Sequence, residues 1–170
     1  MVLCGPIGPA LLLPKSFLCR SLKYSQEAAM PLIARCQCQG FQVEVDGKPD
    51  FTNICHCLDC QRRTGSHVSS NAYFLKENTR ILGEHRLYTR NATKGRQLHN
   101  YFCPTCGSTV CWTLDLRPQY LGVAIGCFND CSFAAPRISL WEDRMYPWTI
   151  LPDGMERFAQ MRPRPDNTEN

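Results

Sequence analysis

Hydrophobic and polar residues alternate most clearly where Phe41, Val43 and Val45 are separated by Gln42 and Glu44. This period of two predicts a half-buried β-strand, and the segment 46–50 that follows it reads as a turn. Segments rich in β-branched and aromatic residues, and bounded by glycine, proline or asparagine, predict further strands at 67–75, 85–89, 96–102, 109–114, 120–128 and 137–141. Short helices are predicted directly after Cys57, ending at Gly65, and over 154–161. We therefore expect a mainly β protein with few short helices.

The composition suits one domain. The chain has 170 residues, 44% hydrophobic and 20% charged, which is enough to bury a single core. We expect that domain over 30–163, with an extension at 1–29 and a loose, polar, proline-rich tail at 164–170. The longest apolar stretch, near Pro9 to Pro14, is short and interrupted by proline, so the sequence predicts no membrane-spanning segment.

The extension 1–29 has three basic residues, Lys15, Arg20 and Lys23, and only one acidic residue, Glu27. Organelle targeting segments have this composition. A disordered extension, or translation begun upstream of a natural start at Met30, is the interpretation that we favour.

Seven of the twelve cysteines fall into three short groups. The groups are Cys36-Gln37-Cys38, then Cys55-His56-Cys57-Leu58-Asp59-Cys60, and Cys103-Pro104-Thr105-Cys106-Gly107. In the third group, the turn directs backbone N–H groups at two sulfurs and Gly107 lets the chain reverse. The first group is expected to place two thiols on one face of an extended strand, because strand side chains alternate.

These spacings favour zinc over two other uses of cysteine. Disulfides are the first alternative, but the chain has no convincing secretory signal and the C-x-x-C turn is typical of metal binding. Iron–sulfur clusters are the second, and the spacings do not match ferredoxin patterns. We expect two zinc ions per chain.

Seven ligands are one short of two closed tetrahedral sites. A structural zinc site has four protein ligands, whereas a catalytic site has three and keeps one position open. Cys36 and Cys38 are the natural partners of Cys103 and Cys106, which leaves the trio Cys55, Cys57 and Cys60 for a zinc ion that could accept an external thiol. An internal eighth ligand stays open as an alternative, with the candidates His56, His99, Cys111, Cys127 and Cys131.

The ordered groups resemble one family closely: the glutathione-dependent formaldehyde-activating enzymes, which share their domain with centromere protein V. The resemblance covers about 32–163. It rests on the C-x-C group, on C-x-C-x-x-C followed by Arg62-Arg63-Thr64-Gly65-Ser66, and on Phe102 to Ser108. The later stretch also fits, at Gly126 to Asp130, Pro136, Trp141, Trp148 and Pro152-Asp153-Gly154. Two positions depart from it: Gln39 intervenes before Gly40, and Gly126-Cys127-Phe128-Asn129-Asp130 stands where members often read G-T-L-D-D.

The resemblance implies a β-tent, made of small antiparallel sheets pinned by zinc. It implies that Cys36, Cys38, Cys103 and Cys106 hold a structural zinc ion, and that Cys55, Cys57 and Cys60 hold the zinc ion that meets the glutathione sulfur. The implied activity is a carbon–sulfur lyase that forms and cleaves S-hydroxymethylglutathione reversibly from glutathione and formaldehyde. Arg62 and Arg63 are candidate contacts for the carboxylates of glutathione, or of a related small thiol adduct.

A non-catalytic zinc module of the centromere protein V type, binding protein or nucleic acid, is the alternative function. Charge argues against nucleic acid, because seven thiolates and two divalent ions lower the formal net charge from +4 to +1. Reduced cysteines point to the cytoplasm, with mitochondria as the other option if the extension is a targeting segment.

Overall fold

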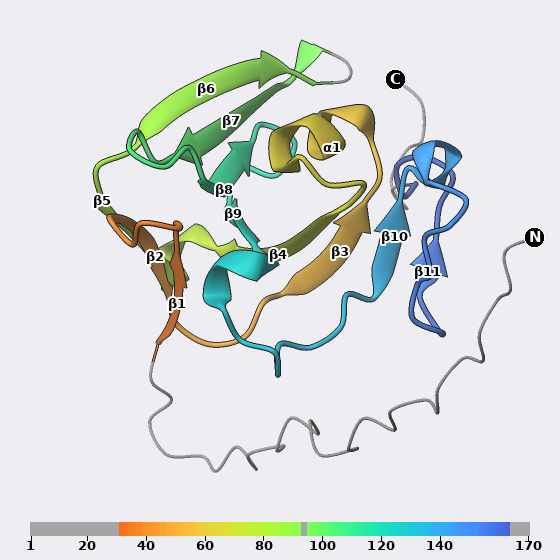
Figure 1. Cartoon of the computed structure of the whole chain (residues 1–170), viewed down its shortest axis with the longest axis horizontal. Helices are drawn as coiled ribbons and strands as arrows, with labels where there is room; N and C mark the ends of the chain where they lie inside the picture. Colours follow the sequence, from red (N-terminus) through yellow and green to blue (C-terminus); the bar gives the residue numbers. More distant parts are fainter. Residues whose placement is uncertain (1–30, 93–94, 164–170) are drawn as a thin grey trace, which may run out of the picture.

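The computed structural model describes residues 31–92 and 95–163; the extension 1–29 and the tail 164–170 lie outside the described residues. These described residues form one short α-helix and a set of strands in two sheets (Figure 1). No helix among the described residues is long and apolar enough to cross a bilayer.

The smaller sheet has the order β1-β2-β5, formed by β1 (Leu32–Arg35), β2 (Phe41–Val45) and β5 (Thr79–Gly83), with both pairings antiparallel. The predicted alternation in β2 is confirmed, because Phe41, Val43 and Val45 are fully buried.

The larger sheet has the order β11-β10-β3-β4-β9-β8-β7-β6. Its central members are β3 (Phe51–Cys55), β4 (Ser69–Leu75), β9 (Tyr120–Ala124) and β8 (Thr109–Leu114), and β7 (Gln97–Phe102) and β6 (Arg86–Asn91) form one edge. All of these pairings are antiparallel, whereas β10 (Ile138–Leu140) and β11 (Glu156–Arg157) add to the other edge in parallel.

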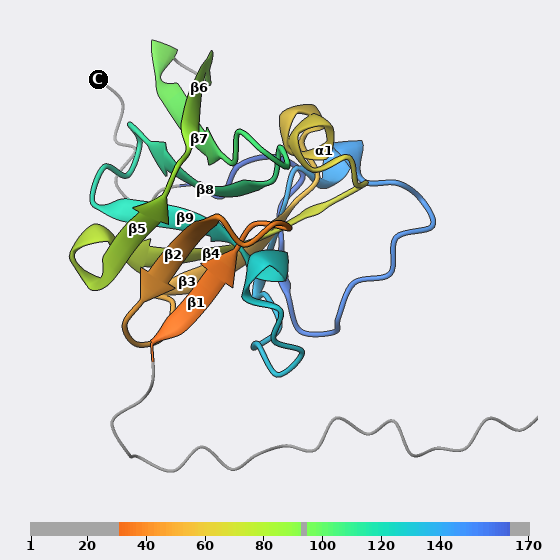
Figure 2. The same ribbon diagram turned by 60° about the vertical axis from the view of Figure 1, so that its left-hand side comes forward.

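The hydrophobic core lies between the two sheets. Ala34 and Phe41 from the smaller sheet belong to the same buried cluster as Phe74, Leu121 and Val123 from the larger one. Figure 2 shows the small sheet, β1, β2 and β5, in front of β3, β4 and β9. The smaller sheet thus covers one face of the larger sheet. Alternate side chains along the strands of the larger sheet point to its other face, away from the core.

The helical segments are few and short, as expected. The helix α1 (Leu58–Thr64) starts after Cys57 and ends at Gly65, which has φ 66° and donates its N–H to Gln61 O at 2.8 Å. The described part of the chain also contains the 3₁₀ turns η1 (Lys76–Asn78), η3 (Ile125–Phe128) and η4 (Glu142–Arg144).

The structure corrects two predicted elements. The strand predicted over 120–128 ends at Ala124, where its pairing with β4 ends, and η3 follows. The helix predicted over 154–161 does not form. Instead, β11 pairs with β10, and the backbone carbonyls of Phe158 and Gln160 accept N–H groups of Glu142 and Trp141. Long-range pairing therefore overrides the local pattern there.

Candidate functional site

Four cysteines meet where two turns face each other. Cys36 and Cys38 lie in the turn between β1 and β2, and Cys103 and Cys106 in the turn between β7 and β8. Their four sulfur atoms all lie within 4.8 Å of one another. Cys38 Sγ is 3.5 Å from both Cys36 Sγ and Cys103 Sγ.

The extended strand expected for Cys36 and Cys38 is wrong, because both sulfurs must converge on one point. The chain turns instead, with the Gln39 N–H donated to Cys36 O at 3.0 Å. Gln39 adopts φ 65°, in the left-handed region that favours glycine. Gln39, which departs from the family pattern by intervening before Gly40, is therefore a non-glycine residue in a strained backbone conformation.

Hydrogen-bond donors surround these sulfurs. The Phe41 N–H donates to Cys36 Sγ at 3.2 Å, and the Ser108 hydroxyl lies 3.3 Å from Cys106 Sγ. Hydrogen bonds from the hydroxyl and the backbone N–H of Ser108 lower the pKa of Cys106 to about 5. Four converging sulfurs with N–H and O–H donors suit a soft divalent ion such as zinc, which binds thiolates.

The second group, Cys55, Cys57 and Cys60, gathers around the start of α1. Cys55 ends β3, Cys57 is the N-cap of α1, and Cys60 lies in the first turn of the helix. The Cys60 N–H donates to Cys57 Sγ at 3.4 Å, as N-cap acceptors do. The three sulfurs lie within 4.8 Å of one another, so they could hold a metal ion as well.

Within the trio, hydrogen bonds shift the pKa values of Cys55 and Cys57 in opposite directions. Hydrogen bonds from the thiols of Cys55 and Cys60, and from the Cys60 N–H, lower the pKa of Cys57 to about 2. The hydrogen bonds with Cys57 and Cys60, together with burial, raise the pKa of Cys55. The hydrogen bonds within the trio therefore favour a thiolate among these three residues.

Among the described residues, no further histidine, cysteine or carboxylate joins the trio. His56 is fully buried, and its Nε2 lies 3.3 Å from Ser139 Oγ. His99 contacts Thr89 Oγ1 at 2.9 Å and Asp115 Oδ1 at 3.4 Å. The other candidates for an eighth ligand are Cys111, buried in the core, Cys127, packed against it, and Cys131, exposed.

Ten of the twelve cysteines of the chain belong to the described residues. The seven cysteines of the two clusters are all free thiols. The two clusters therefore consist entirely of sulfurs that are available to a metal ion.

The trio lies in the wall of a pocket of about 740 Å³. Strand periodicity builds this pocket on the face of the larger sheet that points away from the core. On β4, Ala72 and Phe74 enter the core, whereas Asn71 and Tyr73 line the pocket. Across the sheet, the residue paired with Tyr73 is Gly122, which in turn pairs with Trp112.

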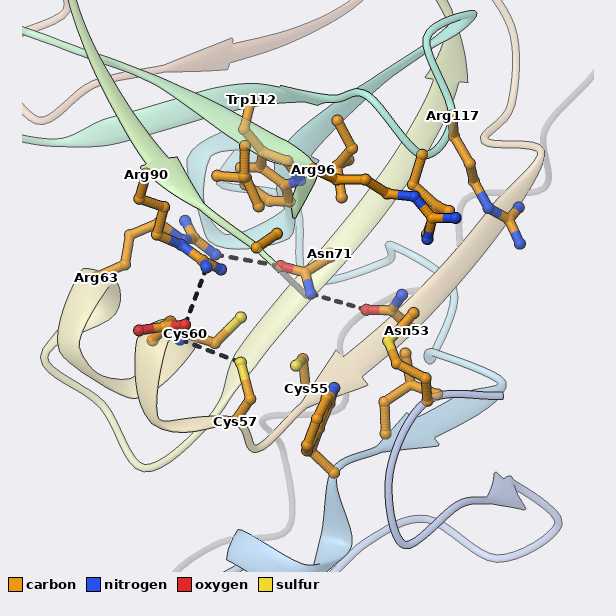
Figure 3. Close-up of a pocket in the computed structure, with 18 of the residues that line it drawn as sticks. Asn53, Cys55, Cys57, Cys60, Arg63, Asn71, Arg90, Arg96, Trp112 and Arg117 are labelled. Atoms are coloured by element: carbon orange, nitrogen blue, oxygen red, sulfur yellow. Dashed lines mark hydrogen bonds and ion pairs between the residues drawn. The ribbon is translucent and has the colours of Figure 1, made fainter. Parts of the chain in front are cut away.

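A hydrogen-bonded chain runs from α1 across the pocket floor (Figure 3). Arg63 Nη2 donates to Ser69 Oγ at 2.6 Å and to Asn71 Oδ1 at 3.4 Å. Asn71 Nδ2 donates to Asn53 Oδ1 at 2.7 Å. The Arg63 guanidinium also lies 4.2 Å from the centre of the Trp112 ring. Arg63 is thus held in one orientation beside the trio.

The pocket is strongly basic. Its lining includes Arg63, Arg90, Arg96, Arg117, Arg144 and Arg162, against one acidic residue, Asp59. Asp59 is ion-paired with Arg90 at 2.9 Å. Arg62, singled out in the sequence together with Arg63, is exposed on α1 and is not part of this lining.

Sequence reasoning missed most of this pocket. Arg90, Arg96 and Arg117 come from β6, from the segment before β7 and from the turn after β8. No local spacing connects them, so the only available signal was the excess of basic over acidic residues in the whole chain.

Three comparisons with known proteins give different results. A search of curated proteins finds no match. A crystal structure of a Rhodobacter sphaeroides protein is similar at 22% sequence identity and a TM-score of 0.46, over 56% of this chain and 85% of that chain. The family model described as glutathione-dependent formaldehyde-activating enzyme matches residues 31–144, which include all seven clustered cysteines. The chain therefore belongs to the glutathione-dependent formaldehyde-activating enzyme family.

Proposed function

We propose that the protein is a zinc-dependent carbon–sulfur lyase that forms and cleaves S-hydroxymethylglutathione. The observation that carries this proposal is the position of a three-sulfur cluster in the wall of a large basic pocket. Glutathione is a thiol with two carboxylates, and the pocket offers sulfur ligands together with guanidinium groups that bind carboxylates.

Each cysteine cluster has a separate role in this proposal. Cys36, Cys38, Cys103 and Cys106 would hold a structural zinc ion, which would tie two turns together. Cys55, Cys57 and Cys60 are the ligands at the reaction site. A zinc ion bound by these three cysteines would supply a site for the thiol of the substrate and would favour its thiolate form.

The pocket residues bind and orient the reactants. Arg63 is fixed by Ser69, Asn71 and Trp112, so its remaining N–H donors are directed without further loss of side-chain entropy. We assign Arg63 to glutathione, and we drop Arg62 because it is exposed outside the pocket lining. In the forward reaction, the glutathione sulfur bonds to the carbonyl carbon of formaldehyde and the thiol proton passes to the carbonyl oxygen. The reverse reaction breaks the same C–S bond.

Two measurements test the proposal. Native mass spectrometry of the reduced protein should give two zinc ions and one glutathione, and Cys57→Ser should lose the glutathione adduct while Cys131→Ser keeps it. Because thiols add to aldehydes without a catalyst, turnover needs its own test. NMR exchange spectroscopy with ¹³C-formaldehyde should show that the protein accelerates exchange between free formaldehyde and S-hydroxymethylglutathione.

Two results would contradict the proposal. Wild-type protein that holds two zinc ions but no glutathione would favour the non-catalytic zinc module. Bound glutathione with an exchange rate no faster than the uncatalysed one would leave a thiol-binding protein without lyase activity.

A further inference from the structure

Three arginines in the pocket have no acidic partner among the described residues: Arg63, Arg96 and Arg117. All three are half-buried. Partial burial of a guanidinium group without a counter-charge is unfavourable, which points to an anionic ligand as the missing partner. Arg63 is already held by Ser69 and Asn71, whereas the other two arginines form a separate group.

Arg96 and Arg117 come from the open end of the hairpin formed by β7 and β8. At that end the Asp115 N–H donates to Gln97 O at 3.2 Å, which joins the two strands, and the Arg117 N–H donates to Leu114 O at 3.1 Å in the turn after β8. Figure 3 shows both arginine side chains extending toward the side of the pocket away from Cys57 and Cys60. The Arg117 guanidinium lies 4.7 Å from the centre of the Phe51 ring, which also lines the pocket.

The strand β3 runs along the pocket, which Phe51, Asn53 and Cys55 line. Phe51 begins this strand and Cys55 ends it, so their Cα atoms are four residues, or about 13 Å, apart. From its sulfur to its terminal carboxylate, the cysteinylglycine part of glutathione spans about 8 Å when extended. With the sulfur at the trio, that carboxylate would lie along β3 between Cys55 and Phe51, where arginine side chains that extend from the Phe51 end would meet it.

A second observation also indicates a peptide-like ligand. Asn100 lines the pocket and is only 5% exposed, yet its Oδ1 has no hydrogen-bond partner. A buried acceptor without a donor is unfavourable, and a ligand N–H would satisfy it. A peptide thiol supplies both this N–H and a carboxylate.

We propose that Arg96 and Arg117 form the subsite for the glycyl carboxylate of glutathione. The glycyl end is assigned rather than the γ-glutamyl end because the γ-glutamyl carboxylate stands beside an ammonium group, which two guanidinium groups repel. This subsite makes the site selective for thiols with a free carboxylate about one residue beyond the cysteine. The inference rests on the proposed function, since it requires the sulfur of the ligand to lie at the trio.

A double-change cycle tests the subsite: the ligand loses its glycyl carboxylate, and the protein loses the two arginines. Calorimetry would compare glutathione with its glycyl monoethyl ester, on wild-type protein and on the double variant Arg96→Ala/Arg117→Ala. Wild-type protein should bind glutathione about tenfold or more tightly than the ester, because charge-assisted hydrogen bonds are lost with the ester. The double variant should bind both ligands equally, at the affinity of wild-type protein for the ester.

Controls separate this effect from charge and from folding. Arg86→Ala removes one exposed positive charge on β6, outside the pocket lining, and should preserve the preference for glutathione. Zinc content and binding of 2-mercaptoethanol, which has no carboxylate, should match wild type in every variant. If the double variant does not fold, the single variants Arg96→Gln and Arg117→Gln should each reduce the preference.

A double variant that still prefers glutathione over the ester would overturn the subsite and leave the proposed function intact. Wild-type protein that binds neither ligand would overturn the proposed function itself.

Discussion

The guanidinium group of Arg63 lies 4.2 Å from the centre of the Trp112 ring, although the two residues come from α1 and β8. Trp112 is 3% exposed, so the ring is a fixed surface. The stacking is a cation–π contact, and together with the bonds to Ser69 and Asn71 it holds a positive charge beside Cys60.

Replacing Trp112 should weaken binding through Arg63. We expect Trp112→Phe to bind glutathione about three- to tenfold more weakly, because phenylalanine is a poorer partner for a cation than tryptophan. Calorimetry in the Arg63→Ala background provides the check, since the effect of Trp112→Phe should vanish there. Trp148→Phe, at a tryptophan that is 62% exposed, is the matched control and should bind normally. An undiminished effect in the Arg63→Ala background would mean that Trp112 acts by another route.

Gly122 allows the Trp112 indole to lie against β9. A Cβ atom at Gly122 would lie 2.2 Å from Trp112 Nε1, so Gly122→Ala must displace the ring or the strand. We expect the free energy of unfolding to fall by about 1–3 kcal/mol, as for overpacked cores. At Gly126 an added Cβ meets nothing within 4 Å, so Gly126→Ala should change stability far less. Urea denaturation of both variants distinguishes them, and equal stabilities would contradict the close contact.

The four-cysteine cluster should stabilise the fold more than the trio does. Cys38 and Cys103 are separated by 65 residues, whereas the trio spans only Cys55 to Cys60. Closing a loop of 65 residues removes unfolded-state entropy worth about 4 kcal/mol in the loop model. We expect Cys38→Ser to lose one zinc ion and to melt far below wild type, and Cys57→Ser to lose the other with a smaller decrease. Zinc analysis combined with thermal denaturation measures both, and a larger decrease for Cys57→Ser would reverse this assignment.

Gln39 offers a stabilising substitution. Its φ of 65° is strained for a residue with a side chain, so Gln39→Gly should raise the free energy of unfolding by about 0.5–1 kcal/mol. Gln37 occupies the same turn without a positive φ, and Gln37→Gly should be neutral or destabilising. Chemical denaturation of the zinc-loaded proteins gives the two values. A destabilised Gln39→Gly would show that the glutamine side chain contributes more than its backbone costs.

The cysteine clusters could be predicted from the sequence because their geometry is local. A C-x-x-C turn that reverses at Gly107, with φ 74°, and a helix that starts at Cys57 bring thiols together over a few residues. The only long-range step was the pairing of Cys36 and Cys38 with Cys103 and Cys106, and the shortage of other cysteine pairs with metal-binding spacing made it the natural choice. The mainly β fold with few short helices also followed from the sequence, since most strands alternate or carry β-branched residues.

Besides β11, which lies where a helix was predicted, the described strands missed in the sequence were 32–35, 51–55 and 79–83. On β3 the reason is physical: Thr52, Asn53, Ile54 and Cys55 are all buried, because the core covers one face of the strand and the pocket the other. Burial on both faces removes the alternation by which a strand is recognised.

The sequence by itself determined which sulfurs could bind metal, because residues a few positions apart are brought together by the turn or helix that they form. Only the tertiary structure decided what surrounds the trio. Arg63, Arg96 and Arg117 are distant in the chain, and they line one pocket because strand pairing in the larger sheet places α1 and the open end of the β7–β8 hairpin around the same face. No spacing in the sequence encodes that pairing, since it depends on how the core packs between the two sheets.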